Sequence, residues 1–404
     1  MSIGENNKIY LDHAATTPVD KEVLKAMMPY FSEKFGNASS VHSFGQEAIA
    51  AVDQAREKIA KYFNCGFAEI IFTGSATEAN NLAIKGLALS LPNYAIAENS
   101  NDYNKFHIIS TKIEHESVLE SLKELEKAGH EVTYLPVDKE GLIKISDIEK
   151  AIKDTTILIS IIYANNEIGT IQPIKEIGKL LEKINKKRLE NKLSKIYFHT
   201  DAVQALNYLE CRPDWLKVDL LTFSGHKIYG PKGIGGLYVR KGISLLPVIS
   251  GGGQEFGLRS GTENISSIVG LAKAVELALE NKEKNYKKIF NLRNQLLKDI
   301  IKDNKIAVNI NSPRGNCLPS ILNIRFSGIN NETLIIALDQ AGVAVSAGSA
   351  CSSRALAASH VLTALGLTQK QAKESIRISI GKNTTKQEIK KAIRIINKYE
   401  RLFV

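Results

Sequence analysis

The stretch Val218-Asp-Leu-Leu-Thr-Phe-Ser224, followed directly by Gly225-His-Lys-Ile-Tyr-Gly-Pro-Lys-Gly-Ile-Gly235, decides the fold. Its first half is apolar and rich in strand-forming residues, and the glycines and proline of its second half are typical of a tight turn. The turn delivers Lys227 just beyond the end of the predicted strand. In doubly wound α/β sheets, ligands bind outside the carboxyl ends of the strands. We therefore expect Lys227 to lie in a ligand site at that end of a parallel sheet.

A second predicted strand, Ile196-Tyr-Phe-His-Thr-Asp201, ends in a carboxylate. If it neighbours the first, Asp201 and Lys227 can face one another, but local periodicity leaves that relation open. The segment Ile157-Leu-Ile-Ser-Ile-Ile-Tyr163 is almost continuously apolar, which suits a central strand covered on both faces. Strand-like and helix-like segments alternate over the first 265 residues, and this pattern predicts an α/β fold with a mostly parallel central sheet and helices on both faces.

Two helices can be predicted from local patterns. Residues 117–128 place apolar side chains on one helical face, and Gly129 follows as a stop. Ser146 and Glu149 form a capping-box pattern, which predicts a second helix that opens at Ser146 and runs through Ile152.

The character of the chain changes after about residue 266, where long charged helices surround a predicted strand at residues 321–326. We predict a large domain at residues 16–265 and a smaller α/β domain formed by residues 1–15 and 266–404. The polar run at residues 93–104 lacks periodicity and is expected to be an exposed insertion.

Composition argues against several classes of function. The net charge of +10 comes from lysines scattered along helix-like stretches, which are typical of solvated faces rather than of a nucleic-acid site. The four cysteines form no close pair, so we expect no metal site and no disulfide framework. No stretch approaches 18 uncharged apolar residues, and no signal peptide opens the chain. We expect a cytoplasmic protein that binds neither membrane nor nucleic acid directly.

Lys227 has the setting that a Schiff-base lysine needs. A lone lysine after a strand is usually a surface charge, but here glycines surround it, and Ser224 and His226 supply short hydrogen-bond donors for a phosphate. Asp201 is then the candidate partner of a pyridinium nitrogen, with a helix N-cap as its structural alternative. Three residues further on, Gln204 can hydrogen-bond a phenolic ring oxygen.

Two further groups fit an aldehyde cofactor that carries a phosphate. The segment Thr73-Gly-Ser-Ala-Thr-Glu-Ala-Asn80 joins a strand to a helix, and its small residues, Ala76 and Thr77 among them, expose backbone N–H groups to an anion. The alternative is a plain helix cap; a nucleotide is disfavoured because no P-loop lysine is present. His115 could stack on the cofactor ring and shuttle protons, although an isolated histidine more often has a structural role.

Taken together, the motifs resemble the cysteine desulfurases of the NifS/IscS family. The resemblance runs from about residue 8 to about residue 400, and its motifs are Tyr10-Leu-Asp-His-Ala-Ala-Thr-Thr-Pro18, Gly36-Asn-Ala-Ser-Ser-Val-His42, Asn165-Asn-Glu-Ile-Gly169, Ser-Gly-His-Lys227, Arg259-Ser-Gly-Thr-Glu-Asn264 and Ala347-Gly-Ser-Ala-Cys-Ser352. These enzymes are similar to class-V aminotransferases, and the Gly-Ser-Ala-Cys loop marks group I of the family.

The resemblance implies a fold-type I enzyme that uses pyridoxal 5′-phosphate (PLP) and acts as a homodimer with active sites at the subunit interface. It implies that Thr262 reaches the phosphate of the partner's cofactor. It also implies that Asn166 and Arg377 hold the carboxylate of the substrate, L-cysteine, a role that suits the arginine fork.

Cys351 distinguishes this interpretation from other enzymes of the same fold. Almost all of its neighbours are small, so the segment should pack weakly and let the thiol move between substrate and acceptor. The expected reaction converts L-cysteine to L-alanine and leaves a persulfide on Cys351. A buried, inert thiol is the alternative, and we expect that state for Cys65, Cys211 and Cys317.

Several alternatives stay open at this point. A selenocysteine lyase or another fold-type I PLP enzyme could share the site, and a non-catalytic docking protein could retain the fold. The sulfur acceptor, which could be an iron–sulfur scaffold protein or part of a tRNA thiolation route, is not identified by the sequence. Three departures from the family pattern are Ser75 in the phosphate turn, Ala358 in place of a proline, and a tail of 27 residues after Arg377.

Overall fold

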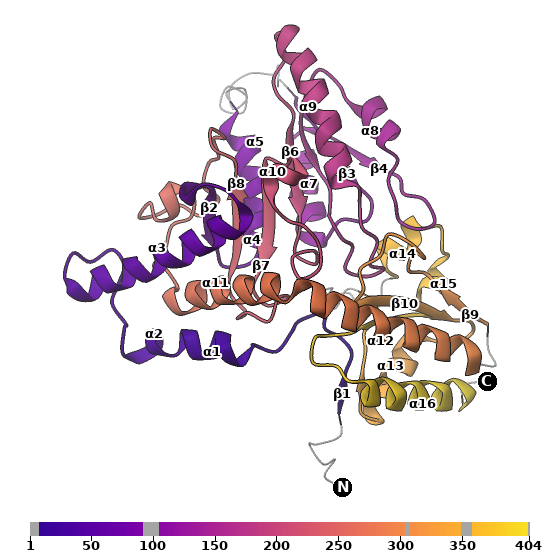
Figure 1. Ribbon diagram of the computed structural model, residues 1–404. Helices are drawn as coiled ribbons and strands as arrows, with labels where there is room; N and C mark the ends of the chain where they lie inside the picture. Colours follow the sequence, from indigo (N-terminus) through magenta and orange to yellow (C-terminus); the bar gives the residue numbers. More distant parts are fainter. Residues whose placement is uncertain (1–7, 92–104, 304–306, 349–357, 403–404) are drawn as a thin grey trace.

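The computed structural model describes residues 8–91, 105–303, 307–348 and 358–402 (Figure 1). Two predictions lie outside these residues. One is the exposed insertion at residues 93–104, and the other is the thiol loop with Cys351.

A seven-stranded sheet forms the centre of the larger part of the molecule (Figure 1). In spatial order its strands are β2 (Ile70–Thr73), β8 (Gly235–Val239), β7 (Leu220–Ser224), β6 (Tyr197–Asp201), β5 (Thr156–Ser160), β3 (His107–Thr111) and β4 (Glu131–Leu135). All neighbouring pairs are parallel except the two pairs that include β8. The predicted mostly parallel sheet is therefore confirmed.

Alternate residues of the strands enter two different hydrophobic cores. Ile71, Leu158 and Leu220 pack on one face, whereas Phe72 and Leu221 pack on the other. Successive side chains of a strand point to opposite faces of the sheet, so a strand that is apolar at consecutive positions needs cover on both sides. The burial of every residue of β5 and β7 agrees with this rule.

Helices cover both faces, as the sequence predicted. The core on the first face includes α4 (Ala76–Asn81), α5 (Leu87–Ser90), the π-helical turn at Leu82–Gly86 between them, and α7 (Glu116–Lys127). The core on the second face includes α1 (Lys21–Met27), α3 (Ser43–Phe63), α8 (Ile145–Ala151), α9 (Ile174–Glu190), α10 (Pro213–Leu216) and α11 (Ile265–Glu280). The short α2 (Pro29–Ser32) follows α1.

A second, three-stranded antiparallel sheet has the order β12 (Ser375–Ser379), β10 (Ile321–Phe326) and β9 (Val308–Ile310). Its separate core includes residues of α12 (Lys282–Asp303), α13 (Asn331–Gln340) and α16 (Lys386–Leu402). The N-terminal β1 (Ile9–Tyr10) pairs with β11 (Val343–Ala344) in the same part of the molecule. Helices α14 (His360–Ala364) and α15 (Gln369–Ala372) precede β12.

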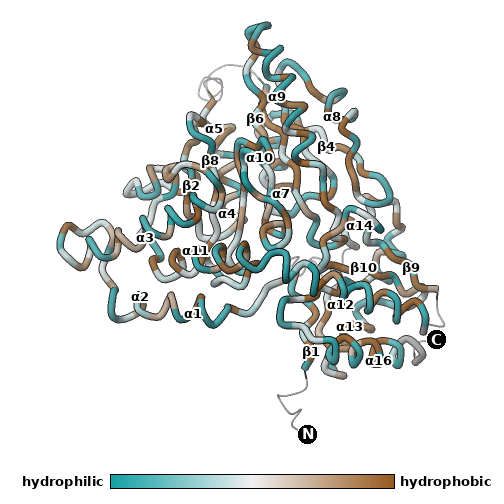
Figure 2. The backbone as a smooth tube through the Cα atoms, in the orientation of Figure 1, coloured by the Kyte–Doolittle hydropathy of each residue, from teal (hydrophilic) through white to brown (hydrophobic). Residues whose placement is uncertain are grey.

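The division of the chain into two domains remains a proposal. Ile9 and Leu11 belong to the core of the second sheet, which supports the inclusion of the N-terminus in the smaller domain. Helix α11, however, packs in the large core, so packing favours a division after α11 rather than at residue 265. Figure 2 shows hydrophobic residues along the central strands, while the outer helices α9 and α12 carry much hydrophilic surface.

The local predictions succeeded except at one helix start and at one strand end, since β5 ends at Ser160 and not at Tyr163. Helix α7 and the strands β6, β7 and β10 lie at the predicted positions, and Gly129 adopts φ +94° after α7. The predicted capping box at Ser146 is wrong, because α8 begins at Ile145 and no side chain caps it. Ile145 packs against the large core, and this contact outweighs a cap, which contributes about 1 kcal/mol.

Candidate active site

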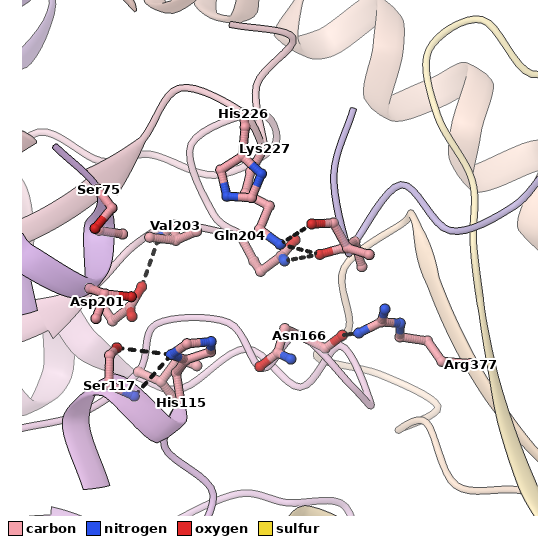
Figure 3. Close-up of a pocket in the computed structure, with 15 residues that line it drawn as sticks. Ser75, His115, Ser117, Asn166, Asp201, Val203, Gln204, His226, Lys227 and Arg377 are labelled. Atoms are coloured by element: carbon pink, nitrogen blue, oxygen red, sulfur yellow. Dashed lines mark hydrogen bonds between the residues drawn. The ribbon is translucent and has the colours of Figure 1, made fainter. Parts of the chain in front are cut away.

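A pocket lies where the carboxyl ends of β6 and β7 meet the second sheet (Figure 3). Fifteen residues line it: Ala14, Ala15, Ser75, Ala76, Thr77, His115, Ser117, Ile162, Asn166, Asp201, Val203, Gln204, His226, Lys227 and Arg377. These residues come from seven separate stretches of the sequence. Nine of them were predicted as site residues: Ala76, Thr77, His115, Asn166, Asp201, Gln204, His226, Lys227 and Arg377.

Lys227 is held by a strained turn after β7. Tyr229, two residues on, has φ +65°, which is rare for a bulky side chain, and the Thr17 hydroxyl both accepts from Tyr229 N and donates to the His226 carbonyl. The Lys227 amine donates to the backbone carbonyls of Ala14 and Ala15 at 2.7 and 2.6 Å. The N-terminal segment thus fixes the position of the amine in the pocket (Figure 3).

Asp201 is the last residue of β6 and is 5% exposed. Strands β6 and β7 are parallel neighbours with Asp201 opposite Thr222, so the open question from the sequence is answered: the two strand ends do deliver the acid and the lysine to one pocket. The carboxylate accepts hydrogen bonds from Val203 N at 3.0 Å and from the Asn80 amide at 2.8 Å. Two donors from different elements therefore orient it.

His115 occupies the N-cap of α7 and lines the pocket. Its Nδ1 accepts from the backbone N of Ser117 at 3.1 Å and lies 2.8 Å from the Ser117 hydroxyl. Because Nδ1 is an acceptor for the backbone N–H, the hydrogen-bond network assigns the proton of the neutral ring to Nε2.

The predicted phosphate turn lies at one end of the pocket. Ser75 caps α4, since its hydroxyl accepts from Glu78 N at 3.1 Å, and Ala76 and Thr77 follow at the start of the helix. A Cβ on Gly235 of β8 would lie 2.7–2.8 Å from Ser75 C and Ala76 N, so only glycine permits the strand to support this turn. The departure at Ser75 therefore supplies a helix cap.

Burial changes the protonation of two groups around the pocket. Desolvation, reinforced by the neighbouring positive charge of Lys227, lowers the pKa of His226 to about 4, so its ring is neutral at pH 7. Its Nδ1 lies 3.2 Å from the Thr16 hydroxyl. Desolvation raises the pKa of the fully buried Glu114 to about 8, with a smaller contribution from the charge of Asp201.

Arg377 enters from the second sheet and is 1% exposed. Its Nη2 donates to Asp12 Oδ1 at 2.7 Å, and its Nη1 donates to the Asn166 carbonyl at 3.0 Å. Each of these nitrogens carries a second N–H, so the fork retains donors for an anionic group in the pocket. Figure 3 shows Arg377 and Asn166 at the end of the pocket away from Asp201.

Three predicted site residues are not in this pocket. Ser224 is buried at the end of β7 and does not line it. Thr262 is exposed and lines a different hollow together with Gly74 and Arg259. Cys351 lies outside the described residues.

Sequence reasoning assigned no role to several residues that build the pocket. The carbonyls of Ala14 and Ala15 hold Lys227, and Asn80 and Ser117 hold Asp201 and His115. Asn80 is four residues after Ala76, so helical periodicity already placed it on the same face of α4 as the predicted phosphate turn. No local pattern marks a backbone carbonyl as an amine acceptor.

The residues present fit PLP. A lysine amine, a carboxylate and a histidine ring converge on one cavity, and the backbone turn at Ala76 lines the same cavity. The buried Arg377 Nε has no hydrogen-bond partner in the described part of the chain, as expected of a guanidinium that still has binding capacity. Among the described residues, no cluster of histidine, cysteine and acidic side chains suits a metal ion, and no helix is long and apolar enough to cross a membrane.

Comparisons with known proteins show the family of this chain. The class-V aminotransferase family model matches residues 9–392. Cysteine desulfurase IscS of Dictyoglomus turgidum is 46% identical over 97% of this chain and 94% of its own length. A NifS-like protein of known structure is 37% identical, with a TM-score of 0.87 over 98% of this chain and 100% of that one.

The solved structure of SspA in complex with cysteine is 39% identical, with a TM-score of 0.76 over 93% of this chain and 99% of that one. These matches span nearly the whole chain, and they agree with the fold. The chain therefore belongs to the class-V aminotransferase family and, within it, to the cysteine desulfurases.

Proposed function

We propose that this chain binds PLP and converts L-cysteine to L-alanine, with the sulfur left as a persulfide on Cys351. One observation carries the proposal: Lys227, Asp201, His115 and Arg377, which are far apart in the sequence, line a single pocket. The relatives named cysteine desulfurase and the relative solved with bound cysteine support the choice of substrate.

PLP, when bound, supplies an aldehyde that condenses with amines and a ring that accepts electrons from the substrate Cα. Lys227 would hold the aldehyde end, and Asp201 would hold a proton on the ring nitrogen. His115 would lie against the ring, Gln204 at the ring oxygen, and Ala76, Thr77 and His226 around the phosphate. The role of Ser224 at the phosphate would require its hydroxyl to turn toward the pocket from the end of β7. Burial of Asp201 excludes water from its carboxylate, which strengthens its attraction for a pyridinium cation.

Substrate orientation falls to groups at the other end of the pocket, and proton transfer falls to Lys227 and His115. The remaining N–H groups of Arg377, together with Asn166, would bind the substrate carboxylate. Lys227 Nζ, once free as an amine, would take the proton from the substrate Cα, with His115 as a second proton carrier. A placed base of this kind contributes about 10²–10⁴-fold to a rate.

The protonation of the other three cysteines supports Cys351 as the nucleophile. Burial raises the pKa of Cys65 to about 12 and that of Cys317 to about 11, and it raises the pKa of the fully buried Cys211 further. These three thiols are therefore protonated at neutral pH and are poor nucleophiles. Cys351 is the fourth cysteine of the chain.

The sulfur transfer balances without an added oxidant. The Cys351 thiolate attacks the substrate Sγ, an S–S bond forms, and the Sγ–Cβ bond breaks. The electron pair of that bond stays with the carbon, which gains a proton and leaves as alanine. Cys351 keeps the transferred sulfur as a persulfide, which an acceptor protein would then take up.

We also propose a homodimer and a protein acceptor in the cytoplasm. Thr262 is exposed and lies outside the pocket of its own subunit, which suits a contact with a partner's cofactor. The acceptor could be an iron–sulfur scaffold protein or a component of tRNA thiolation, because a persulfide can serve either route.

The test compares wild type with Cys351→Ala for the release of alanine and sulfide from L-cysteine in the presence of a thiol reductant. Wild type is expected to release both, and Cys351→Ala is expected to bind PLP with an unchanged absorbance spectrum but to release neither. Cys65→Ala is the matched control and should behave as wild type. The sedimentation mass of the wild-type protein should correspond to two chains.

Three other results would each contradict a different part of the proposal. Sulfide release by Cys351→Ala at the wild-type rate would contradict the thiol mechanism and favour a lyase that needs no nucleophilic cysteine. A strong preference for selenocysteine over cysteine would favour the selenocysteine lyase alternative. A sedimentation mass of one chain for an active enzyme would contradict the role of Thr262 across subunits.

A further inference from the structure

Asn80 lies behind the pocket wall, on α4, and is completely buried. It does not line the pocket, so it would not touch a bound molecule. Its amide nitrogen Nδ2 donates two hydrogen bonds, one to Asp201 Oδ2 and one to Ser117 Oγ, each of 2.8 Å. The two N–H groups of one amide therefore donate to residues on two different walls of the pocket, Asp201 and Ser117.

The orientation of this amide follows from electrostatics. The opposite orientation would place the Asn80 carbonyl oxygen 2.8 Å from a carboxylate oxygen of Asp201, and two acceptors repel at that distance. In the assigned orientation, Asn80 Oδ1 is buried with no partner in the described part of the chain. An unpaired buried carbonyl costs free energy, so the fold accepts a penalty to keep both donors in place.

The second bond determines what Ser117 can do. The Ser117 hydroxyl oxygen accepts from Asn80, and its own hydrogen is then available to His115 Nδ1 at 2.8 Å. The backbone N of Ser117 donates to the same Nδ1. A continuous chain of hydrogen bonds thus runs from Asp201 through Asn80 and Ser117 to His115, and it keeps the His115 ring proton on Nε2.

We propose that Asn80 is a positioning residue that couples Asp201 to His115, so that one amide sets the acid at the ring nitrogen and the histidine at the ring face. The inference rests on the proposed function. Helix α4 also begins with Ala76 and Thr77 at the predicted phosphate turn. A single short helix would therefore fix the phosphate, the ring nitrogen and the ring face relative to one another.

The test uses four variants of the full-length protein loaded with PLP. Asn80→Ala removes both hydrogen bonds, and Asn80→Leu removes both with little change in volume. Ser117→Ala removes only the branch to His115. Asn81→Ala is the matched control, because this neighbouring amide on α4 donates to the Thr77 carbonyl at the helix surface and, among the described residues, not to Asp201 or Ser117. The readouts are kcat and KM for L-cysteine, and the pH titration of the absorbance of bound PLP.

Both Asn80 variants are expected to lose about 10- to 100-fold in kcat, the effect of losing one hydrogen bond to a charged group, with little change in KM. A less well-held Asp201 keeps the ring nitrogen protonated less effectively, and a ring with less positive charge raises the pKa of the Schiff-base nitrogen on Lys227. The absorbance titration, which reports that nitrogen, is therefore expected to move to higher pH. Ser117→Ala should lose less activity and keep the wild-type titration. Asn81→Ala should match wild type in both.

The inference is overturned if Asn80→Ala or Asn80→Leu folds normally and retains the wild-type kcat and titration. It is also overturned if activity falls only in proportion to the fraction of folded, PLP-loaded protein while the titration stays unchanged. Failure of the wild-type protein to bind PLP or to make alanine would be a different result, because it overturns the proposed function itself and the inference with it.

Discussion

The two ends of the pocket hold their charged groups in different ways. At the end formed by the central sheet, Asp201 and Lys227 follow directly from two neighbouring parallel strands, and short-range geometry brings them together. At the other end, Arg377 comes from an antiparallel strand of the second sheet. Its position depends on Asp12 and on the Asn166 carbonyl, which are 365 and 211 residues away in sequence.

This difference separates the two tasks that we propose for the site. The sheet end would hold a cofactor that stays bound, and its acid and its lysine come from the ends of two neighbouring strands of one sheet. The other end would receive the substrate, and its arginine is held by Asp12 and by the Asn166 carbonyl, which lie outside both sheets. A change at the sheet end should therefore alter cofactor chemistry, whereas a change at Arg377 should alter substrate binding.

The largest effect is expected at the sheet end, from Lys227→Ala. Loss of the amine should reduce alanine formation by at least about 10²–10⁴-fold, since the proposed base is removed. Borohydride treatment of the PLP-loaded wild type should attach the cofactor covalently to the peptide that contains Lys227. The same treatment of Lys227→Ala should attach none, and mass spectrometry measures both.

Lys232→Ala is the matched control because Lys232 belongs to the same turn but is exposed and lines a separate hollow. It should behave as wild type in both measurements. Covalent attachment to another lysine, or near-normal activity of Lys227→Ala, would contradict the assignment of Lys227 to the cofactor. The sheet end could then no longer be distinguished as the end that holds the cofactor.

The sheet end is also the part of the site that could be predicted from sequence. Strand composition and turn residues are local signals, and parallel strands deliver their carboxyl ends to one side of a sheet, so Asp201 and Lys227 could be assigned together. The order of the strands could not be derived, because nothing in either segment encodes its neighbour. The capping box at Ser146 failed for a related reason: packing of Ile145 in the large core moved the helix start.

Long-range contacts account for what sequence reasoning missed. The bonds from Lys227 to the Ala14 and Ala15 carbonyls span more than 200 residues, and the bond from Asn80 to Asp201 spans 121. Such contacts arise only when the folded segments dock. Arg377 was assigned from a family resemblance alone, since an arginine in a short apolar strand has no local feature that marks a substrate site.

An intermediate effect is expected at the other end, from Arg377→Lys. Lysine keeps the positive charge but loses the planar fork that can bind a carboxylate bidentately. The KM for L-cysteine should rise about 10- to 100-fold, the loss of one or two charge-assisted hydrogen bonds. The PLP absorbance spectrum should stay that of wild type, and steady-state kinetics with spectra of the same samples measure both.

Arg325→Lys, on the neighbouring strand β10 and outside the pocket, is the control and should keep the wild-type KM. An unchanged KM in Arg377→Lys would show that the substrate carboxylate binds elsewhere. A changed PLP spectrum would show that the two ends of the pocket are not separable in the way we propose.

The smallest effect concerns Glu114, which is buried next to His115 in the sequence and lies outside both ends of the pocket. Its Oε1 accepts from Ile162 N at 3.0 Å, while its backbone carbonyl lies 3.0 Å from His360 Nε2 on α14. Burial raises the pKa of Glu114 to about 8, so the folded protein holds a proton that the unfolded chain releases near its ordinary pKa of 4.5. The unfolding free energy of the protein therefore falls as pH rises from about 4.5 to 8, because the unfolded chain releases this proton first.

Glu114→Gln removes this titration, so the variant should lose less stability than wild type between pH 5 and pH 8. Between pH 5 and pH 8, the unfolding free energy of wild type should fall by about 1–2 kcal/mol more than that of the variant. This is less than the full linkage value, because relaxation and water penetration reduce the cost of a buried charge. Urea unfolding of the PLP-free proteins at both pH values measures it. Glu116→Gln, which removes an equal charge two residues away, should run parallel to wild type. If Glu114→Gln also runs parallel to wild type, Glu114 is ionised in the folded protein over this pH range, and the predicted rise of its pKa is wrong.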